Sequence, residues 1–506
     1  MGDICQDFPS CTEEISIAEL KAEHYQDGFG IFHPAPRLSW RFSATTAPNW
    51  KQSAYEIAIT RGGKTQSFRV ESSKSSLVPW PSSTLASREV AHVSVRATGT
   101  NGVQSGWAKL TVEAALLKRS DWQADLISGP PQDVDKPKPP FRMRKSFEYD
   151  GGPARLYATA HGIYQVEING QICGDQVLSP GWQSYRHRLH YQTYDVTRFL
   201  IPGRNTIGVY LGEGWFAGRL GRPGVSNIWG SRLGFPGQLE VNGHIIYRTD
   251  HAWEVLVDGP ILSSEIYNGE VYDKAVLIAP EAPPVRRILQ LQPQRIITTP
   301  SGKKVLDFGQ NLAGWLSVNI DIPVTGTVTI RHAEAMEHGE LGTRPLRTAK
   351  ASTVIHLGGE TPRCRYADVT GYDACSLSDF TAIVVSSDLR RTGTFECSHD
   401  HLNKLHENTI WSMRGNFISV PTGCPQRDER LGWTGDIQVF TPTASFLYDT
   451  AAFIGGWLQD VEADQKDLGG IVPNVVPCIP MPPKHNENKA MAAWGDTVIL
   501  TPWDLY

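Results

Sequence analysis

A two-residue alternation of apolar and polar side chains, broken by glycine-rich turns, limits what the first part of this chain can fold into. Residues 54–59 and 91–97 alternate in this way, and Gly62-Gly63 and Asn101-Gly102 mark turns. Successive side chains of a strand point to opposite faces, so this pattern predicts half-buried strands joined by hairpins. We expect a small β-sandwich over residues 15–120, preceded by a tail at 1–14.

Two more β-rich regions follow. Residues 130–140 are rich in proline and charge, which predicts a linker. Beyond it, 164–168 and 206–211 read as strands, and Asn169-Gly170 is a strong hairpin turn signal. This indicates a domain of jelly-roll size over 141–295. Strand-like segments at 327–331 and 382–385 predict a further β-sandwich over 296–395.

The apolar period changes after Ser398. Leu402, Leu405, Trp411 and Met413 recur at helical spacing, with Asp400 placed to serve as an N-cap. Residues 437–447 and 451–461 also read as helices. The fold class is therefore multidomain, with three all-β domains followed by a helical region over 396–506.

Charge and targeting signals exclude several classes of protein. The net charge of −5 and pI near 6.3 argue against nucleic acid or anionic membrane as a partner. The chain has no signal peptide, no N-glycosylation sequon and no apolar run of the roughly 18 residues that span a bilayer. We expect a cytoplasmic protein. The 8 cysteines are scattered, which predicts no disulfide framework.

The densest polar cluster lies between Pro421 and Asp436. Arg427, Asp428, Glu429 and Arg430 are adjacent there, and Trp433 and Asp436 follow. One interpretation is a solvated helix start with local ion pairs. The other is a sugar-cleaving site, because glycosidic cleavage needs a carboxylic acid to protonate the leaving oxygen and a second carboxylate on the other face of the ring. An aromatic platform and acceptors for sugar hydroxyls complete such a site.

The segment CPQRDERLGWTGD, residues 424–436, closely resembles the signature of the α-L-rhamnosidases of glycoside hydrolase family 78. The resemblance runs through most of the chain. It includes Pro36–Arg41 in a fibronectin-type module, Leu178–Trp182 and Leu211–Phe216 in a jelly-roll module, Asp307–Asn311 and Arg331–Glu334 in a third β domain, and Ser398–Val420, Trp494–Asp496 and Pro502–Tyr506 in an (α/α)6 catalytic barrel.

The resemblance implies roles for individual residues. Glu429 would be the general acid of an inverting hydrolysis that releases terminal α-L-rhamnose from rhamnose-containing glycosides. Trp433 and Asp436 would line the sugar subsite, Asp428 and Arg427 would support the acid, and Trp494 would form the pocket wall. A general acid must hold its proton near neutral pH, so we expect Arg427 and Arg430 to point away from Glu429. No cofactor and no metal are expected, although Asp175 and Glu213 are conceivable calcium ligands.

Three departures from the family pattern stand out. Gly423 occupies a position where the family usually has a sugar-binding Asp. Residues 358–369 look short, because only Arg365-Tyr366 remains of a usual strand motif, which predicts an opened sheet edge or a changed pairing. The chain ends at Tyr506, which suggests an incomplete barrel with exposed apolar helix faces and no general base. On one helix Glu429 and Asp436 would be about 10 Å apart, beyond the usual spacing of inverting pairs.

Other interpretations remain beside the enzyme. One is a catalytically inactive carbohydrate-binding pseudoenzyme whose sugar-stacking surface comprises Tyr157, Tyr164, Trp182, Trp215 and Trp229. Such a protein would serve a small-molecule glycoside or secondary-metabolite pathway. Another is a shortened chain with a longer, active parent. The sequence assigns neither an aglycone nor an oligomeric state.

Overall fold

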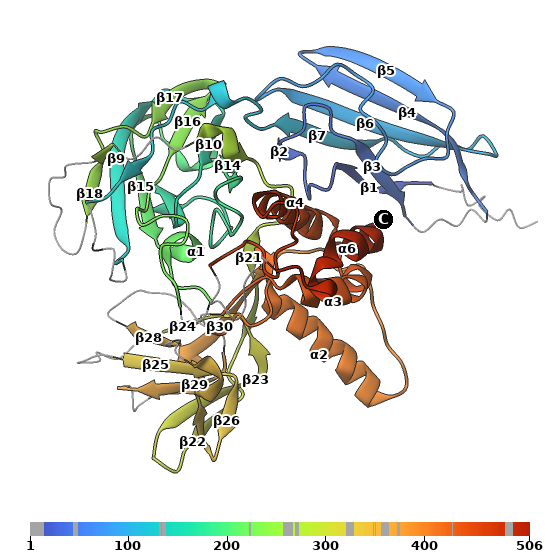
Figure 1. Cartoon of the computed structure of the whole chain (residues 1–506). Coiled ribbons are helices and arrows are strands. Elements are labelled where there is room, and N and C mark those ends of the chain that lie inside the picture. Colours follow the sequence, from blue (N-terminus) through green and yellow to red (C-terminus); the bar gives the residue numbers. More distant parts are fainter. Residues whose placement is uncertain are drawn as a thin grey trace, which may run out of the picture. The chain divides into compact units, whose positions relative to one another are not determined.

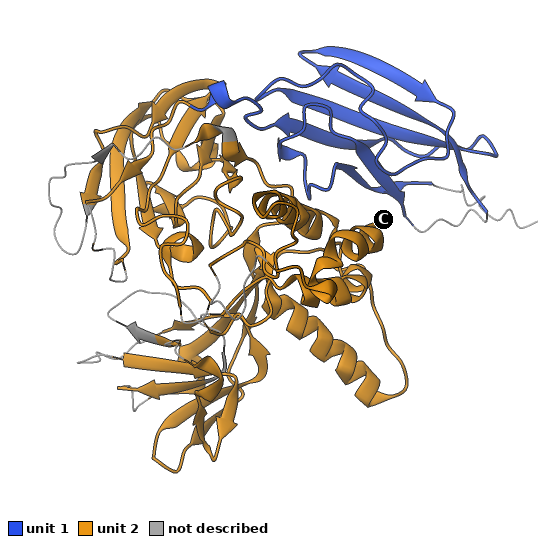
Figure 2. Ribbon diagram, viewed as in Figure 1, with its two compact units in different colours: residues 1–122 blue, residues 123–506 orange. Residues whose placement is uncertain are grey.

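The computed structural model divides into two compact units, residues 1–122 and 123–506, drawn in separate colours in Figure 2. It describes residues 15–43, 49–130, 133, 138–221, 224–256, 267–268, 273–319, 328–347, 349, 351–355, 364–371, 375–427, 429–480 and 489–506. No helix within these ranges is long and apolar enough to cross a bilayer.

The first unit consists of a two-stranded sheet, β1-β3, and a five-stranded sheet in the order β2-β7-β6-β4-β5 (Figure 1). Alternate side chains of β4 and β6, including Tyr55, Ile57, Val93 and Val95, form a shared core with Trp40 of β3. The elements are β1 (Ile17–Ala22), β2 (Phe29–Ile31), β3 (Leu38–Phe42), β4 (Gln52–Arg61), β5 (Lys64–Val70), β6 (Val90–Gly99), β7 (Ala108–Ala114) and η1 (Arg119–Asp121).

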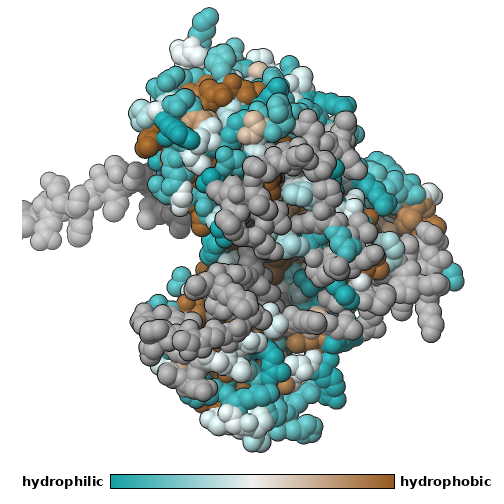
Figure 3. Space-filling view, turned by 90° about the vertical axis from the view of Figure 1, so that its left-hand side faces the viewer, coloured by the Kyte–Doolittle hydropathy of each residue, from teal (hydrophilic) through white to brown (hydrophobic). Residues whose placement is uncertain are grey.

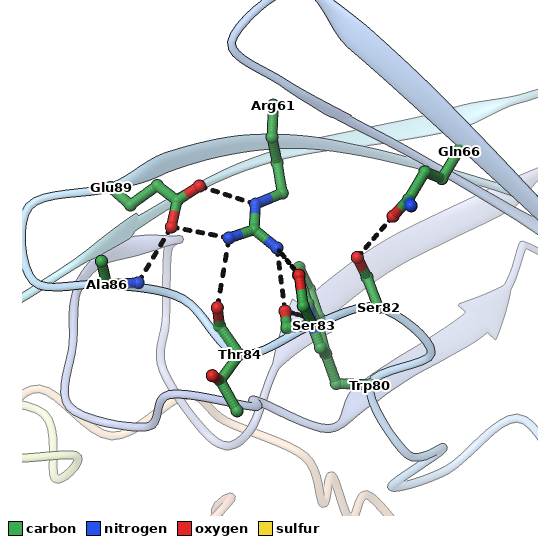
Figure 4. A network of polar contacts seen from close by, with 8 residues as sticks. All are labelled: Arg61, Gln66, Trp80, Ser82, Ser83, Thr84, Ala86 and Glu89. Carbon is green, nitrogen blue, oxygen red and sulfur yellow. Dashed lines mark hydrogen bonds and ion pairs between the residues drawn. The ribbon is translucent and has the colours of Figure 1, made fainter.

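Arg61, at the end of β4, ties down the connection that leads into β6 (Figure 4). Its guanidinium binds both carboxylate oxygens of Glu89 at 2.7 Å and donates to the carbonyl oxygens of Ser83 and Thr84. The hydrogen bond from Arg61 lowers the pKa of Glu89. A bidentate guanidinium fixes both the position and the orientation of its partner, so one side chain orders this loop.

The second unit begins with two antiparallel sheets, β12-β11-β15-β9-β18 and β14-β10-β16-β17. Every second residue of β11 and β15 is buried, as the sequence alternation predicts. The elements are β8 (Ile127–Ser128), β9 (Phe141–Tyr149), β10 (Ala154–Ala158), β11 (Ile163–Ile168), β12 (Gln171–Ile172), β13 (Leu189–His190), β14 (Gln192–Asp195), η2 (Thr197–Phe199), β15 (Gly203–Gly212), α1 (Gly214–Ala217), β16 (Gly237–Val241), β17 (His244–Arg248), β18 (Glu254–Leu256), β19 (Tyr267–Asn268), η3 (Lys274–Val276) and β20 (Leu277–Ile278).

A second pair of sheets follows, β21-β30-β24 and β22-β23-β29-β25-β28. Phe308, Ile330 and Phe380 lie in the core that these sheets share. The elements are β21 (Val285–Leu291), β22 (Arg295–Thr298), β23 (Lys304–Leu312), β24 (Gly314–Val318), β25 (Val328–Ala333), β26 (Ala335–Glu337), β27 (Glu340–Gly342), η4 (Arg344–Leu346), β28 (Ser352–Ile355), β29 (Cys364–Thr370), η5 (Leu377–Asp379) and β30 (Phe380–Ser387).

The described part of the short segment 358–369 corrects one expectation. β29 lies in the middle of its sheet and pairs with β23 on one side and β25 on the other. The edges of that sheet are β22 and β28. An opened edge at this position is therefore wrong, because the backbone groups of β29 have partners on both sides. Residues 356–363 lie outside the described residues.

Helices dominate the chain after β30. They are α2 (Asp400–Asn416), α3 (Thr434–Leu447), α4 (Ala451–Asp467), α5 (Ala492–Gly495) and α6 (Thr497–Leu505), with the short strands β31 (Phe417–Ile418) and β32 (Val420–Pro421) between α2 and α3. The helices expected at 437–447 and 451–461 are confirmed as parts of α3 and α4. The N-cap of α2 is His399 rather than Asp400, which lies inside the first turn.

Several large apolar side chains of α3 and α6 face solvent. Val439 is 77% exposed, Ile499 69% and Trp503 75%. Exposed apolar side chains mark an interaction surface or an aggregation-prone one where they form a contiguous patch. On the face of the molecule drawn in Figure 3, by contrast, the apolar residues appear as separate patches among hydrophilic ones.

Candidate active site

The signature segment forms a loop between β32 and α3. Thr422 fixes its entry, since the backbone N–H and the hydroxyl of Thr422 both donate to the carbonyl oxygen of Asn416, at 2.9 and 2.8 Å. The loop then closes on itself, because the N–H of Gly423 donates to the carbonyl oxygen of Leu431 at 3.0 Å. Leu431 is buried and anchors the far side.

A close backbone contact fixes the end of the loop. The N–H of Val476 donates to the carbonyl oxygen of Gly432 at 2.8 Å, and the indole N–H of Trp457 donates to the carbonyl oxygen of Val476 at 3.1 Å. A Cβ on residue 432 would lie 2.4 Å from the oxygen of Val476, so glycine is required there. This contact places Trp433 at the start of α3.

Glu429 sits in this loop with only 9% of its surface exposed. Its Oε1 accepts a hydrogen bond of 2.6 Å from the indole Nε1 of Trp433. Its Oε2 accepts from Arg427, whose Nη2 is 3.0 Å away and whose Nε is 3.2 Å away. The same Nη2 lies 2.7 Å from Sγ of Cys424. Both oxygens of the buried carboxyl group are therefore occupied by donors.

These contacts correct one expectation. Arg427 does not point away from Glu429, but forms an ion pair with it in which both side chains are largely buried. The reason is local, because residues 427 and 429 lie on the same side of an irregular loop. The interpretation of the segment as a solvated helix start is also wrong, since residues 424–433 precede α3 and the carboxyl group of Glu429 is shielded.

Asp436 and Trp494 flank the loop from α3 and α5. Asp436 lies in the first turn of α3, so it does not share a helix with Glu429. Burial, and secondarily the charge of Glu429, raise the pKa of Asp436, which indicates that the two carboxyl groups are neighbours. Trp494 packs on the backbone of Gly435, where an added Cβ would lie 2.9 Å from the indole ring. The structure thus brings Glu429, Arg427, Trp433, Asp436 and Trp494 into one region. Asp428 lies outside the described residues.

Gly423 borders the platform formed by Trp433. A Cβ at residue 423 would lie 3.2 Å from Cδ1 of Trp433, which is a tight contact with the edge of the indole. A side chain at residue 423 would therefore lie beside the indole ring of Trp433, which by the resemblance lines the sugar subsite.

Cys424 is the residue whose role the sequence reasoning missed. It touches Arg427, and burial together with the charge of Glu429 raises the pKa of its thiol. The three-residue spacing between Cys424 and Arg427 in the signature was the available signal, because a tight turn brings such positions together.

Three of the five residues expected to form the sugar-stacking surface of a pseudoenzyme do not reach the surface. Tyr157, Tyr164 and Trp182 are buried. The hydroxyl of Tyr164 lies within hydrogen-bond distance of two acceptors inside the sheet pair, Oε1 of Gln192 at 2.7 Å and the carbonyl oxygen of Ala158 at 3.0 Å. Trp215 is half-buried and stacks on Trp182 with ring centroids 6.0 Å apart. The placement of Tyr157, Tyr164 and Trp182 on such a surface is therefore wrong, whereas Trp229 is half-buried like Trp215, and for these two residues the interpretation stays a prediction.

The two conceivable calcium ligands have other partners. Asp175 forms an ion pair with Arg286 at 2.9 Å, and Glu213 accepts a hydrogen bond of 2.8 Å from the backbone N–H of Lys138. Lys138 is itself buried and donates to Asn227 at 2.6 Å, so the described end of the expected linker is packed against the domain. Over the described ranges, no three His, Cys, Asp or Glu side chains are grouped to hold a metal ion.

Comparison with protein-family models gives four matches along the chain. They are the Rha78A-like N-terminal immunoglobulin domain over residues 17–118, the alpha-L-rhamnosidase N-terminal domain over 152–280, the bacterial alpha-L-rhamnosidase concanavalin-like domain over 297–386, and the bacterial alpha-L-rhamnosidase 6 hairpin glycosidase domain over 390–506. The last match contains the signature loop and its flanking helices.

Individual relatives agree with these matches. An alpha-L-rhamnosidase of Formosa agariphila is 33% identical, over 98% of this chain and 60% of the relative. The crystal structure of native α-L-rhamnosidase from Aspergillus terreus is 43% identical with a TM-score of 0.90, and the match covers 97% of this chain and 62% of that one. An α-L-rhamnosidase of Streptomyces avermitilis, crystallised with L-rhamnose, shares the fold at 24% identity, with a TM-score of 0.84 and coverage of 97% and 68%. The chain spans 60% of this Formosa relative and 38% of a curated Streptomyces avermitilis relative.

Proposed function

The chain belongs to the α-L-rhamnosidases of glycoside hydrolase family 78, and from this premise we propose that its signature loop supplies the acid half of an inverting rhamnoside hydrolysis. Its substrates would be glycosides with a terminal, non-reducing α-L-rhamnose. The observation that carries the proposal is Glu429, a shielded carboxyl group held between Trp433 and Arg427.

In the proposed reaction the carboxyl proton of Glu429 passes to the glycosidic oxygen as the bond from that oxygen to the anomeric carbon of rhamnose breaks. A water molecule attacks the anomeric carbon from the opposite face, which inverts the configuration. That water needs a general base, and we assign no residue of this chain to it. Trp433 and Trp494 supply aromatic walls, and Asp436 supplies an acceptor for a sugar hydroxyl.

The contacts of Arg427 suggest how the carboxyl group is released for this step. Each oxygen of Glu429 already accepts a hydrogen bond, so one oxygen must be freed before it faces the leaving group. Nη2 of Arg427 has Sγ of Cys424 as a second acceptor at 2.7 Å. We propose that Arg427 turns toward Cys424 when Glu429 carries its proton.

The test is the release of p-nitrophenol from p-nitrophenyl α-L-rhamnoside by the purified chain. We expect Glu429→Gln to abolish turnover, because the amide has no proton to give at neutral pH. Glu462→Gln, at an exposed position of α4, is the matched control and should leave turnover unchanged. Proton NMR of the first product should show β-L-rhamnose. Unchanged turnover in Glu429→Gln, or α-L-rhamnose as the first product, would contradict the mechanism.

If the purified chain shows no turnover, catalysis by this chain is refuted and the sugar subsite is tested separately. Calorimetric titration with L-rhamnose should then detect binding that Trp433→Ala removes. Absence of that binding would refute the subsite as well.

A further inference from the structure

Apart from the signature loop, a polar groove lies between helix α2 and strand β23, which contact each other (Figure 1). It has a volume of about 320 Å³. At about 30 Å³ per water molecule, this is room for roughly ten waters, or for a sugar of one or two rings. It is lined by residues of β23 and α2, among them Gln310, Asn311, Asn408, Trp411, Ser412 and Asn416.

The groove is lined mainly by polar, uncharged side chains. Four of the named side chains are amides and one is a hydroxyl, while the half-buried indole of Trp411, which has the guanidinium of Arg414 5.2 Å from its centroid, adds an aromatic edge. The charged residue Lys404 also borders the groove, but its Nζ is 2.8 Å from the carboxylate of Glu407. Lys404 is the only charged residue among the described residues that line the groove. Amides, a hydroxyl and an aromatic wall suit a neutral molecule with many hydroxyl groups.

Two of these amide side chains have a carbonyl oxygen that accepts no hydrogen bond from the described residues. The Nδ2 of Asn416 donates to the carbonyl oxygen of Ser412 at 2.9 Å, but its Oδ1 is buried and accepts no hydrogen bond from the described residues. The Nδ2 of Asn311 donates to Glu334 at 3.0 Å, and this exposed side chain leaves its Oδ1 open to water or a ligand. A buried acceptor without a donor is unfavourable until a ligand or water supplies one. The groove therefore presents one buried acceptor, Oδ1 of Asn416, to which a hydroxyl group could donate.

The groove is also joined to the signature loop. The carbonyl oxygen of Asn416, in its wall, accepts both hydrogen bonds from Thr422 that fix the entry of that loop. The groove and the loop are thus linked through the backbone of Asn416, and they use different side chains.

We propose that the groove between α2 and β23 is an accessory binding site for a neutral saccharide, separate from the rhamnose subsite at Trp433. Its occupant is a sugar unit of a larger glycan or a free oligosaccharide, recognised by amide hydrogen bonds and by contact with Trp411.

The experiment is a calorimetric titration of the intact chain with maltose, cellobiose and L-rhamnose as neutral probes and with D-galacturonate as a charged probe. The titrations use the Trp433→Ala background, which removes the sugar platform of the proposed active site. We expect at least one neutral probe to bind in this background. Asn408→Ala should weaken that binding about tenfold, since one lost hydrogen bond to a sugar is of that order. Ser412→Trp should abolish it by filling the groove.

Asn408 and Ser412 are exposed on α2, so both variants should fold, and an unchanged thermal midpoint will check this. His401→Ala, at an exposed position of the same helix outside the groove, is the matched control and should bind like the background. The proposal is overturned if no neutral probe binds in the Trp433→Ala background. It is equally overturned if binding survives Ser412→Trp, or if D-galacturonate binds as tightly as the neutral probes. None of these outcomes depends on whether the chain hydrolyses rhamnosides.

Discussion

Replacing Arg188 by Met should destabilise the second unit, and should do so more at pH 8 than at pH 5. Nη1 of Arg188 lies 2.9 Å from Oδ1 of Asp460, which is 2% exposed on α4. The pair joins the loop before β13 to α4, together with a hydrogen bond from Arg188 to the carbonyl oxygen of Gly456 at 2.6 Å. Breaking a buried ion pair from one side costs about 3–5 kcal/mol, because the remaining charge stays buried without a partner.

The pH dependence follows from the carboxyl group of Asp460. Burial raises its pKa to about 6, despite the nearby Arg188. Its pKa in an unfolded chain is about 3.9. The folded state therefore holds the proton more tightly, and this stabilisation is lost as pH rises through about 6. A shift of about two units corresponds to roughly 3 kcal/mol. In Arg188→Met the buried carboxylate loses its cation and keeps the hydrogen bond of 3.3 Å from the N–H of Ser184, so its pKa rises further and holding it charged at pH 8 is costly, whereas at pH 5 the neutral acid does not need the cation.

The assay is guanidinium unfolding at pH 5 and pH 8, with hydrogen–deuterium exchange of the α4 amides to identify the transition that includes this pair. Each variant is compared with the parent at the same pH, because buried histidines act in the opposite sense. Burial lowers the pKa of His161 to about 4, so its contribution is lost as pH falls from about 6.5 toward 4. Lys466→Met, on the exposed face of α4, is the control and should change little.

Two results would refute this reasoning. One is an equal loss of stability in Arg188→Met at pH 5 and pH 8, which would mean that the Asp460 charge is not the source of the cost. The other is an Asp460→Asn variant that keeps the full pH difference of the parent, since that variant cannot titrate at residue 460.

Three further predictions concern the signature loop. Trp433→Phe keeps an aromatic ring but loses the 2.6 Å hydrogen bond to Glu429. The kcat on p-nitrophenyl α-L-rhamnoside should therefore fall about tenfold to a hundredfold, with a smaller change in KM. Equal changes in kcat and KM would contradict this role. Gly423→Asp adds an acceptor beside Trp433, so L-rhamnose should bind about tenfold more tightly in a calorimetric titration. Gly423→Ala adds only bulk and should give no gain in affinity. Equal affinities of the two variants would argue against the acceptor. Gly435→Ala improves helix propensity but places a methyl group 2.9 Å from the ring of Trp494. Because this contact displaces the ring, L-rhamnose binding should weaken. An unchanged Kd would show that Trp494 is not part of the pocket.

Local features of the sequence predicted the secondary structure best. The hairpin at Asn169-Gly170 is confirmed, since Ile168 pairs with Gln171 and both turn residues have positive φ, 52° and 77°. The helices α3 and α4 are confirmed for a similar reason, because helical periodicity is a property of neighbouring residues. Apolar spacing alone did not predict burial, however, since Leu402 and Leu405 of α2 are exposed.

The candidate site was predicted in composition but not in geometry. The motif named Glu429, Trp433 and Asp436, but the loop that separates Glu429 from α3 depends on a contact between Gly432 and Val476. Such a contact joins residues far apart in the chain, so no local pattern carries it. The buried aromatic residues Tyr157 and Trp182 were misassigned for a related reason. A sequence shows that an aromatic residue is present, but not whether its ring faces solvent or the core.

The contact between Cys424 and Arg427 affects how chemical modification of this protein should be interpreted. The thiol is partly shielded, and its pKa is raised by burial and by Glu429, so it should react slowly with alkylating reagents. Once modified, it would displace the guanidinium that holds Oε2 of Glu429. Inactivation by a thiol reagent, and protection against it by L-rhamnose, would then resemble the behaviour of a cysteine nucleophile. The sulfur would nevertheless have no part in bond cleavage, and a Cys424→Ser variant that keeps turnover would distinguish the two explanations.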